Sequence, residues 1–420
     1  MLPTWKASEE RIHCQWEKIV ALPPASVHKG QGRTEVIRRL RNALGLTKQA
    51  MPAGLRFDRP LVLFQSDDWG RAGVRDREGW EELRAAGLNL GEKPYDFYSI
   101  ETAEDLHALG EVLRKHRDST GRRPSMVMNF IMANVDFDRC FERGRKGIPL
   151  RPLTEGLPGT WHRPHLLEAY QQGIRERLFY PALHGLTHFC ERAMERELDA
   201  GGERSQLIKK LWRAQTPYIY WRTPWVGYEY WDPDMRPALR FLPMDDQRAA
   251  IRNAAGIFRE LFAAGPFSAC APGYRANADS KTAWFETGVR VVQNGVQNSP
   301  GERTGPHLDQ NGMLSTFRTV AIEPATERCD LETLVARVEQ CFVTGLPAVI
   351  SIHSINFHST IKDFRTPTLK LIDEFLSAIE RKWPDLLYVH DAELFSIATE
   401  GAYAGENGRV RVSATTGADR

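Results

Sequence analysis

The sequence predicts an α/β fold whose parallel strands form a closed or nearly closed (β/α) barrel with long insertions. From residue 60 onward, short apolar runs of strand type alternate with longer segments of helical period, a pattern typical of βα units around a parallel sheet. About eight such runs over roughly 340 residues suit a barrel. An open doubly wound sheet is the alternative. No Gly-x-Gly-x-x-Gly motif follows the first strand, so a dinucleotide site has no support.

The elements follow one another in a clear order along the chain. Residues 1–59 are expected to form an N-terminal extension in which Thr34–Leu44 is a short basic helix ending at Gly45. The barrel is expected over residues 60–400, interrupted by an insertion at 192–243. The expected strands are Leu61–Gln65, Met126–Ile131, Leu178–Leu183, Phe267–Ala271, Val289–Gln293, Leu314–Ile322, Ala348–His353 and Leu386–His390. The expected helices are Ala103–His116, His165–Arg175, Met244–Ala264, Leu331–Phe342 and Thr366–Lys382. Residues 401–420 are small, polar and Gly-rich, which predicts a disordered tail.

Composition narrows the range of partners and compartments. The 420 residues include 42% hydrophobic and 26% charged residues, with a net charge of +2, so neither nucleic acid nor an anionic membrane is indicated as a partner. Six cysteines lie far apart, which favours a reducing compartment over a disulfide scaffold. Because the first residues lack the apolar core of a signal peptide and no stretch resembles a membrane helix, the sequence predicts a cytoplasmic protein. The oligomeric state is left open.

The stretch Leu61–Gly70 carries the first chemical signal. Its apolar run ends in the adjacent carboxylates Asp67 and Asp68, followed by Trp69. Aspartate is disfavoured inside strands, and two neighbouring like charges are stabilised by a cation between or beside them. We interpret the pair as part of a metal site at the end of a strand. Taken alone, the same residues also describe an ordinary turn.

Three further motifs follow later strands. His184 and His188 are four residues apart, a spacing that puts both imidazoles on one face of a helical turn and suits a metal chelate. Arg275 could hold a carboxylate through a bidentate contact, and His353 ends an apolar run. Each motif also has a purely structural explanation. His184 and His188 could cap helices or lie on the surface, Arg275 could be a surface residue in a turn, and His353 could be a hydrogen-bonded core histidine. Because polar groups at the carboxyl ends of barrel strands gather in one place, we expect a shared site.

The segment Trp212–Trp231 is unusually rich in aromatic residues, prolines and glycines. Two interpretations stand side by side. It is either a surface subdomain that buries its own aromatics, or an aromatic wall or lid over a site that accepts a sugar or another ring. In the second interpretation, Trp221 and Trp225 contact substrate.

In order and strand context, Asp67-Asp68, His184-x-x-x-His188, Arg275 and His353 resemble the polysaccharide deacetylases, the family four carbohydrate esterases with a NodB-like domain. The resemblance covers residues 60–400. It implies a distorted (β/α) barrel of about seven to eight strands and one divalent metal ion, zinc. Carried over by position, it implies that Asp68, His184 and His188 bind the metal. Asp67 is then the catalytic base, Arg275 orients it, and His353 is the general acid.

The sequence departs from the family pattern in three places. Arg275-Ala276-Asn277-Ala278 stands where the family has Arg-x-Pro-Tyr, the Asp-Trp motif that supports the acid histidine has no counterpart, and the bulky Trp69 follows Asp68. These changes point away from a polymeric substrate. The residues expected to contact substrate are Trp69, Tyr274, Asn277, Trp221 and Trp225.

The sequence therefore predicts a metal-dependent hydrolase that removes an N-acyl group, N-acetyl in the leading case, from an amino sugar or a related amide. Metal-activated water would attack while Asp67 accepts its proton and His353 protonates the amine. The substrate is expected to be a small molecule or a glycan. The alternatives are a small-molecule amidase or cyclic-imide hydrolase on the same fold, and a barrel without catalysis that serves as a binding module. A glycosidase is a weaker alternative, because it would need two carboxyl groups across a sugar and no metal.

Overall fold

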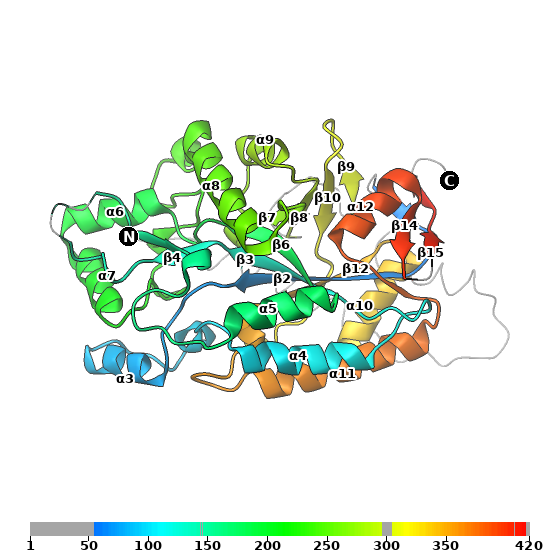
Figure 1. Cartoon of the computed structure of the whole chain (residues 1–420), viewed down its shortest axis with the longest axis horizontal. Coiled ribbons are helices and arrows are strands. Elements are labelled where there is room, and N and C mark those ends of the chain that lie inside the picture. Colours follow the sequence, from blue (N-terminus) through cyan, green and yellow to red (C-terminus); the bar gives the residue numbers. More distant parts are fainter. Residues whose placement is uncertain (1–53, 143, 145, 296–304, 407, 417–420) are drawn as a thin grey trace, which may run out of the picture. The chain divides into compact units, whose positions relative to one another are not determined.

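A computed structural model describes residues 54–420, apart from 143, 145, 296–304, 407 and 417–420. The expected helix Thr34–Leu44 lies outside the described residues. A ten-stranded sheet runs through the described part of the chain (Figure 1). In spatial order, its strands are β11 (Val320–Ala321), β12 (Ala348–His353), β2 (Leu61–Trp69), β3 (Met126–Ile131), β6 (Phe179–Gly185), β7 (Ser268–Cys270), β8 (Val291–Asn294), β10 (Leu314–Phe317) and β9 (His307–Leu308), with β13 (Leu387–Tyr388) also paired to β2.

The pairings of this sheet are parallel, except for the antiparallel contact of β9 with β10. The sheet is curled into a half-barrel form, which confirms the α/β class. The expected strand Leu314–Ile322 is divided: β10 pairs with β8, whereas β11 pairs with β12 at the other end of the sheet. Arg318 and Thr319 separate the two strands, so Arg318 lies on the segment that joins both ends of the curled sheet.

Alternate side chains of the central strands enter two separate hydrophobic clusters. In β2, Val62 and Phe64 belong to the larger cluster, whereas Leu61 and Leu63 belong to the other. This period of two follows from the pleat of a strand. Continuing the series of Leu61 and Leu63 leads to Asp67 at the carboxyl end. The face that is apolar at the amino end of the strand therefore becomes polar where the site is expected.

Helices alternate with the strands as expected (Figure 1). The anticipated helices are confirmed, with boundaries shifted by at most two residues, as α4 (Ala103–Lys115), α5 (Leu166–Arg175), α8 (Met244–Phe262), α10 (Leu331–Val343) and α11 (Arg365–Lys382). Further helices are α3 (Arg77–Ala85), α6 (Glu191–Ala200), α7 (Glu203–Arg213), α9 (Ala278–Glu286) and α12 (Asp391–Glu400). Helix α4 packs against α5 and α11, and α8 packs against α9 and β6. None of the helices in the described ranges is long and apolar enough to cross a membrane.

The region 192–243 begins with α6 and α7. It continues as a loop that contains the short 3-10 helices Pro224–Val226 and Pro237–Leu239. Isolated bridges join Tyr228 to Trp231 and Trp231 to Phe241. Most of the aromatic segment is therefore irregular backbone, as its prolines and glycines predict.

The expectation of a disordered tail is wrong for residues 402–406 and 408–416. They form β14 (Ala402–Gly405), which pairs with β15 (Gly408–Arg411), and β16 (Ala414–Thr416), which pairs with β1 (Leu55–Phe57). Tyr403 and Val412 are almost fully buried in the smaller hydrophobic cluster. These two apolar side chains hold the tail, although its average composition is small and polar. Another short pair consists of β4 (Ala133–Val135) and β5 (Leu150–Pro152).

A buried histidine links α4 to α11 and makes stability depend on pH. His116 places Nε2 2.9 Å from Asp373 Oδ1 and Nδ1 3.1 Å from Glu380 Oε2. Burial lowers the pKa of His116, but the two carboxylates outweigh it and raise the pKa above the ordinary value. A raised folded-state pKa stabilises the protein below the unfolded pKa of histidine, and this stabilisation is lost as the pH rises through the folded pKa.

We therefore expect His116→Gln to lower the melting temperature more at pH 6 than at pH 9. Thermal unfolding followed by circular dichroism across this range measures the difference. His162→Gln, which changes an exposed histidine, serves as the control and should shift the melting temperature little at either pH. A His116→Gln deficit of the same size at both pH values would contradict the assignment of charge to this histidine.

Candidate metal centre and active site

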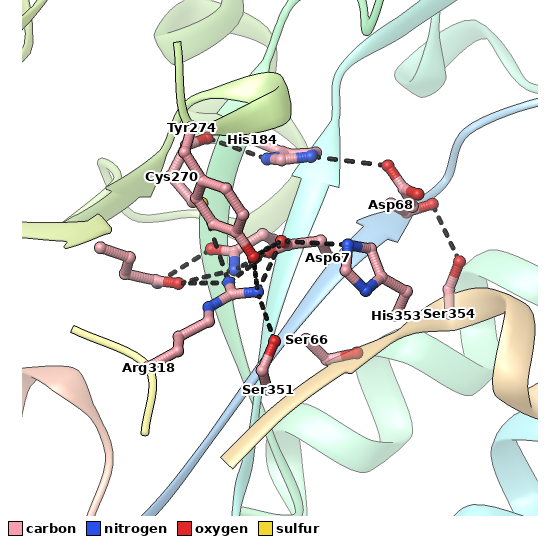
Figure 2. A network of polar contacts seen from close by, with 12 residues as sticks. Ser66, Asp67, Asp68, His184, Cys270, Tyr274, Arg318, Ser351, His353 and Ser354 are labelled. Atoms are coloured by element: carbon pink, nitrogen blue, oxygen red, sulfur yellow. Dashed lines mark hydrogen bonds and ion pairs between the residues drawn. The ribbon is translucent and has the colours of Figure 1, made fainter. Parts of the chain in front are cut away.

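A β-bulge near the end of β2 positions the two carboxylates. The strand does not end at Gln65 as expected but continues to Trp69, and its register with β3 shifts between Ser66 and Trp69. Within this bulge Asp68 has a φ of 75°, a conformation that non-glycine residues adopt at a cost of about 1–3 kcal/mol. Bulges redirect side chains next to functional sites. Here Asp67 and Asp68 reach different partners in one site (Figure 2).

A second register shift positions the histidines. Phe130 and Ile131 of β3 pair with Leu183 and Gly185 of β6, so His184 is the extra residue. His188 follows after a bend. The two imidazoles are therefore brought together by a bulged strand end and a bend, and the expected helical turn between them is wrong.

The bend after β6 is packed tightly against Glu229. The residue at its start, Gly185, has a φ of 151°, and a Cβ there would lie 2.0 Å from Glu229 Oε2. Glu229 also accepts a hydrogen bond from the Leu186 backbone N–H at 2.8 Å. The aromatic-rich loop thus supports the backbone between the two histidines.

Asp68, His184 and His188 form a buried triad whose ligand atoms all lie within 4.8 Å of one another. Asp68 Oδ1 is 3.5 Å from His184 Nε2 and 3.1 Å from His188 Nε2. His184 Nδ1 donates to the Cys270 carbonyl at 2.9 Å, and His188 Nδ1 shares a hydrogen bond of 2.7 Å with the Tyr218 hydroxyl. These outer contacts orient each ring so that Nε2 faces Asp68, as metal-binding histidines require.

The protonation of the triad also suits a metal. Burial lowers the pKa of His188 to about 4, so its imidazole is neutral at physiological pH. Burial would raise the pKa of Asp68, but the charge of Arg71 and contacts with both histidines hold it well below the ordinary value. An ionised carboxylate and two imidazoles are ligands that Zn²⁺ prefers, and three protein ligands leave positions open for water and substrate.

A second group, Asp67, His184 and Cys270, also has ligand atoms close together. It suits a metal less well. Burial raises the pKa of the Cys270 thiol well above its ordinary value, whereas a cysteine ligand binds as the thiolate. Asp67 is also already held by other partners.

Arg318 holds Asp67 through a bidentate ion pair (Figure 2). Nη1 donates to Oδ2 at 2.6 Å and Nη2 donates to Oδ1 at 2.5 Å, and each side chain is only 3% exposed. Asn129 donates to Oδ1 at 2.8 Å. Burial would raise the pKa of Asp67, but the Arg318 charge outweighs it and keeps the pKa far below the ordinary value. Asp67 is therefore ionised throughout the physiological range.

Arg275, which the resemblance assigns to orient Asp67, does not do so. Its guanidinium lies 4.8 Å from the centre of the Trp231 ring. After β7 the backbone turns through left-handed conformations at Gly273 and Tyr274, and the Tyr274 hydroxyl reaches Asp67 Oδ2 at 3.4 Å. The corrected partner, Arg318, gives a modest signal in the sequence: it is the one charge inside an otherwise uncharged strand-like run, 314–322.

His353 is paired with Glu323, a residue that the motif comparison missed. His353 Nδ1 lies 2.6 Å from Glu323 Oε1, and its Nε2 lies 3.7 Å from Asp67 Oδ2. Asn356 donates to Glu323 Oε2 at 2.7 Å. Burial lowers the pKa of His353, but Glu323 outweighs it and raises the pKa to about 9. The side chain is 29% exposed, so this protonated imidazole lies at the open side of the site.

Three residues expected to contact substrate have structural roles instead. Trp69 is fully buried, donates to Ser66 Oγ at 2.8 Å and stacks on Phe357. Asn277 caps α9. Trp225 is largely buried in the main hydrophobic cluster. The local backbone turns these side chains into the core or onto a helix end.

The other two expected contacts have different outcomes. Tyr274 joins the site, since its hydroxyl also accepts a hydrogen bond from Arg318 at 2.7 Å. Trp221 is 42% exposed and lies edge-on to Tyr95. The aromatic segment does approach the metal triad, but through tyrosines around His188: Tyr218, Tyr220 and Tyr228.

A buried Asp-His-His triad, with an ionised carboxylate on one side and a His-Glu pair on the other, has the groups of a metal-assisted hydrolase.

No protein-family model and no curated protein sequence matches the chain. Solved structures similar to it include a protein from Mycobacterium smegmatis assigned as a polysaccharide deacetylase, with 11% identity and a TM-score of 0.42 over 83% of this chain and 93% of that one. The 4-α-glucanotransferase from Thermococcus litoralis has 12% identity and a TM-score of 0.42 over 81% of this chain and 41% of that one. The peptidoglycan deacetylase PdaC from Bacillus subtilis has 10% identity and a TM-score of 0.34 over 81% and 91%. A shared fold does not fix a function, so the side chains of the site must decide the function of this chain.

Proposed function

We propose that this protein is a metal-dependent hydrolase that removes an N-acyl group, N-acetyl in the leading case, from an amino sugar or a related amide. One observation carries the proposal: the Asp68, His184 and His188 triad lies beside Asp67, which is ion-paired with Arg318, and beside His353, whose Nε2 is 3.7 Å from Asp67 Oδ2. A divalent ion held by the triad, with Zn²⁺ the best match to its donors, would polarise the amide carbonyl and acidify a water molecule.

The side chains of the chain divide the proton transfers between them. Asp67 accepts a proton from the attacking water as the new C–O bond forms. Arg318 makes Asp67 a permanently ionised but weak base, which suits water that is already acidified. His353 donates its Nε2 proton to the amine nitrogen as the C–N bond breaks, while its Nδ1 proton stays on the hydrogen bond to Glu323. The products are a carboxylate and a free amine.

The way the sheet closes supports the roles of Asp67 as base and His353 as acid. We interpret Leu314–Ala321 as one strand that closes a barrel, because β10 pairs with β8 and β11 pairs with β12. In this interpretation, closure brings Arg318 opposite Asp67 and places Glu323 behind His353. The finer description as a (β/α)7–8 barrel rests on counting the two short strands as one.

The depth of the site favours a small substrate within this class. Asp67, Asp68 and His184 are each 2% exposed. A single amino sugar or a small amide can approach groups at this depth more readily than the middle of a polymer chain. The small-molecule amidase is therefore the second candidate, on the same metal site and with the same roles for Asp67 and His353.

Acetate release tests the proposal directly. The purified chain, loaded with Zn²⁺, is incubated with a panel of N-acetylated sugars and small amides, and free acetate is measured. We expect release that stops on chelation and returns when Zn²⁺ is restored. Full activity of a metal-free protein would overturn the metal mechanism. Bound metal without hydrolysis of any N-acyl compound would instead favour a binding module.

Glu323 should set the alkaline limit of the activity. The general acid must be protonated, so the rate is expected to fall as the pH rises through the His353 pKa of about 9. Glu323→Gln removes the charge that raises this pKa, and the fall should move to lower pH. Profiles of kcat/KM against pH for the two proteins measure the shift. The exposed Glu332→Gln, changed at the start of α10, is the control. An unchanged alkaline limb in Glu323→Gln would exclude His353 as the acid.

A further inference from the structure

Arg71 is a buried cation in the metal site for which the proposed reaction has no use. It is 4% exposed, and its Nη1 lies 3.3 Å from Asp68 Oδ1. The same oxygen is the one nearest to Nε2 of His184 and His188. Arg71 therefore lies immediately beside the position that the triad offers to a divalent ion.

Most of the hydrogen-bonding capacity of this guanidinium is unused. It is surrounded by tyrosine rings, with its central carbon 4.0 Å from the ring centre of Tyr98, 5.4 Å from Tyr218 and 5.8 Å from Tyr95. Ring faces attract a cation, but they do not replace oxygen acceptors for its five N–H donors. Nε has no hydrogen-bond partner among the described residues. Donors of Arg71 therefore remain available beside the metal site.

The balance of charge points in the same direction. A divalent ion would already neutralise Asp68. The Arg71 guanidinium, 3.3 Å from the same carboxylate, would then be repelled by the ion. With the ion bound, the fixed cations Arg71 and Arg318 leave positive charge in excess of the carboxylates Asp67, Asp68 and Glu323, even if His353 is neutral. Glu101 is paired with His358 instead, with its Oε2 3.4 Å from Nε2 of that histidine. An anionic group on the substrate would neutralise this excess positive charge.

We propose that Arg71 binds an oxyanion group of the substrate, so that the preferred N-acyl compound carries a carboxylate or a phosphate near its amide. This inference rests on the proposed hydrolase function and names the substrate class within it. The planar guanidinium suits both groups through paired N–H donors. The tyrosine rings fix Arg71 on the side of the triad that contacts the aromatic-rich loop.

Three matched probes test the idea: N-acetylglucosamine, N-acetylmuramic acid, which adds a carboxylate, and N-acetylglucosamine 6-phosphate. We expect the chain to favour one of the anionic probes in kcat/KM by about tenfold to hundredfold, the worth of one hydrogen-bonded charge pair. The preferred probe identifies carboxylate or phosphate. In Arg71→Gln the preference for the anionic probe over the neutral sugar should disappear.

Calorimetric binding of the preferred anionic probe gives a readout that is independent of turnover. Its Kd should rise by a similar factor in Arg71→Gln, both with and without zinc. Arg71→Lys should restore part of the affinity, because lysine keeps the positive charge but lacks the paired N–H donors of the planar guanidinium. The control is Arg75→Gln, four residues further along, which breaks pairs with Asp76, Glu78 and Glu82 outside the triad and should leave the preference unchanged.

Two failures are distinguishable. Equal kcat/KM of the wild-type chain for neutral and anionic probes, or an equal loss for all probes in Arg71→Gln, would overturn the role of Arg71 alone. Absence of hydrolysis of every N-acyl compound by the zinc-loaded chain would overturn the proposed hydrolase. The wild-type comparison needs no variant, so the inference can be tested even if Arg71→Gln does not fold.

Discussion

Asp68→Ala and His184→Ala are expected to lose the bound divalent ion, whereas Asp67→Asn is expected to keep it and to lose most of its activity. Asp68 and His184 belong to the triad whose ligand atoms face one another, and loss of one of three ligands weakens binding severely. Asp67 is held by Arg318 and Asn129 instead. Loss of a general base lowers the rate by about 10²–10⁴-fold. Elemental analysis of each purified variant, with acetate release on the preferred substrate, measures both effects.

Cys270→Ala is the control that separates the two possible ligand sets. Cys270 belongs to the second group, with Asp67 and His184, so its replacement should leave the metal content at the wild-type level if the triad of Asp68, His184 and His188 is correct. Loss of metal in Cys270→Ala and in Asp67→Asn, with retention in Asp68→Ala, would assign the ion to the other group. Metal retained in all four variants would exclude both.

Arg318→Met is expected to destabilise the fold by about 3–5 kcal/mol, because it leaves the Asp67 carboxylate buried without its ion-pair partner. The two side chains are each 3% exposed, so water does little to replace the lost contact. Urea unfolding at neutral pH measures the change in the free energy of unfolding. The double variant Asp67→Asn with Arg318→Met should recover part of the loss, since the uncompensated charge is then absent.

The pH dependence of this deficit has a definite sign. Arg318 lowers the folded-state pKa of Asp67 far below the ordinary value of 3.8, and such a group contributes stability that is present above the unfolded pKa and lost as the pH falls. The difference between wild type and Arg318→Met should therefore be largest near neutral pH and shrink toward acid pH. A deficit independent of pH would indicate lost packing rather than a lost ion pair.

Arg275→Met is the matched control for Arg318→Met. It makes the same chemical change at the arginine that the family motif assigns to this role, but Arg275 contacts the Trp231 ring and no carboxylate hydrogen bond to it is found among the described residues. We expect a loss of about 1 kcal/mol or less, the size of a partly exposed cation–π contact, and an unchanged metal content. A larger loss of activity in Arg275→Met than in Arg318→Met would restore the family assignment.

Local patterns in the sequence determined the α/β class, the boundaries of five of the helices and the residues of the candidate metal triad. Strand-like runs such as Leu61–Phe64 and Ala348–Ile350 are apolar because both faces are buried, and polar residues at their carboxyl ends stand out against them. Asp67, Asp68, His184, His188 and His353 could therefore be recognised without knowledge of which strands are neighbours. Parallel strands deliver their carboxyl ends to the same edge, and this shared direction made a common site predictable.

Only the tertiary structure decided which partners these residues have. Arg318 rather than Arg275 holds Asp67, because the segment between β10 and β11 joins both ends of the sheet, and such a junction depends on strand order. Glu323 reaches His353 through the pairing of β11 with β12. The bulges at Asp68 and His184 are register shifts between neighbouring strands, which no single strand contains in its own sequence. A partner across the sheet is a property of the fold, whereas the tendency to form each strand is a property of the residues within it.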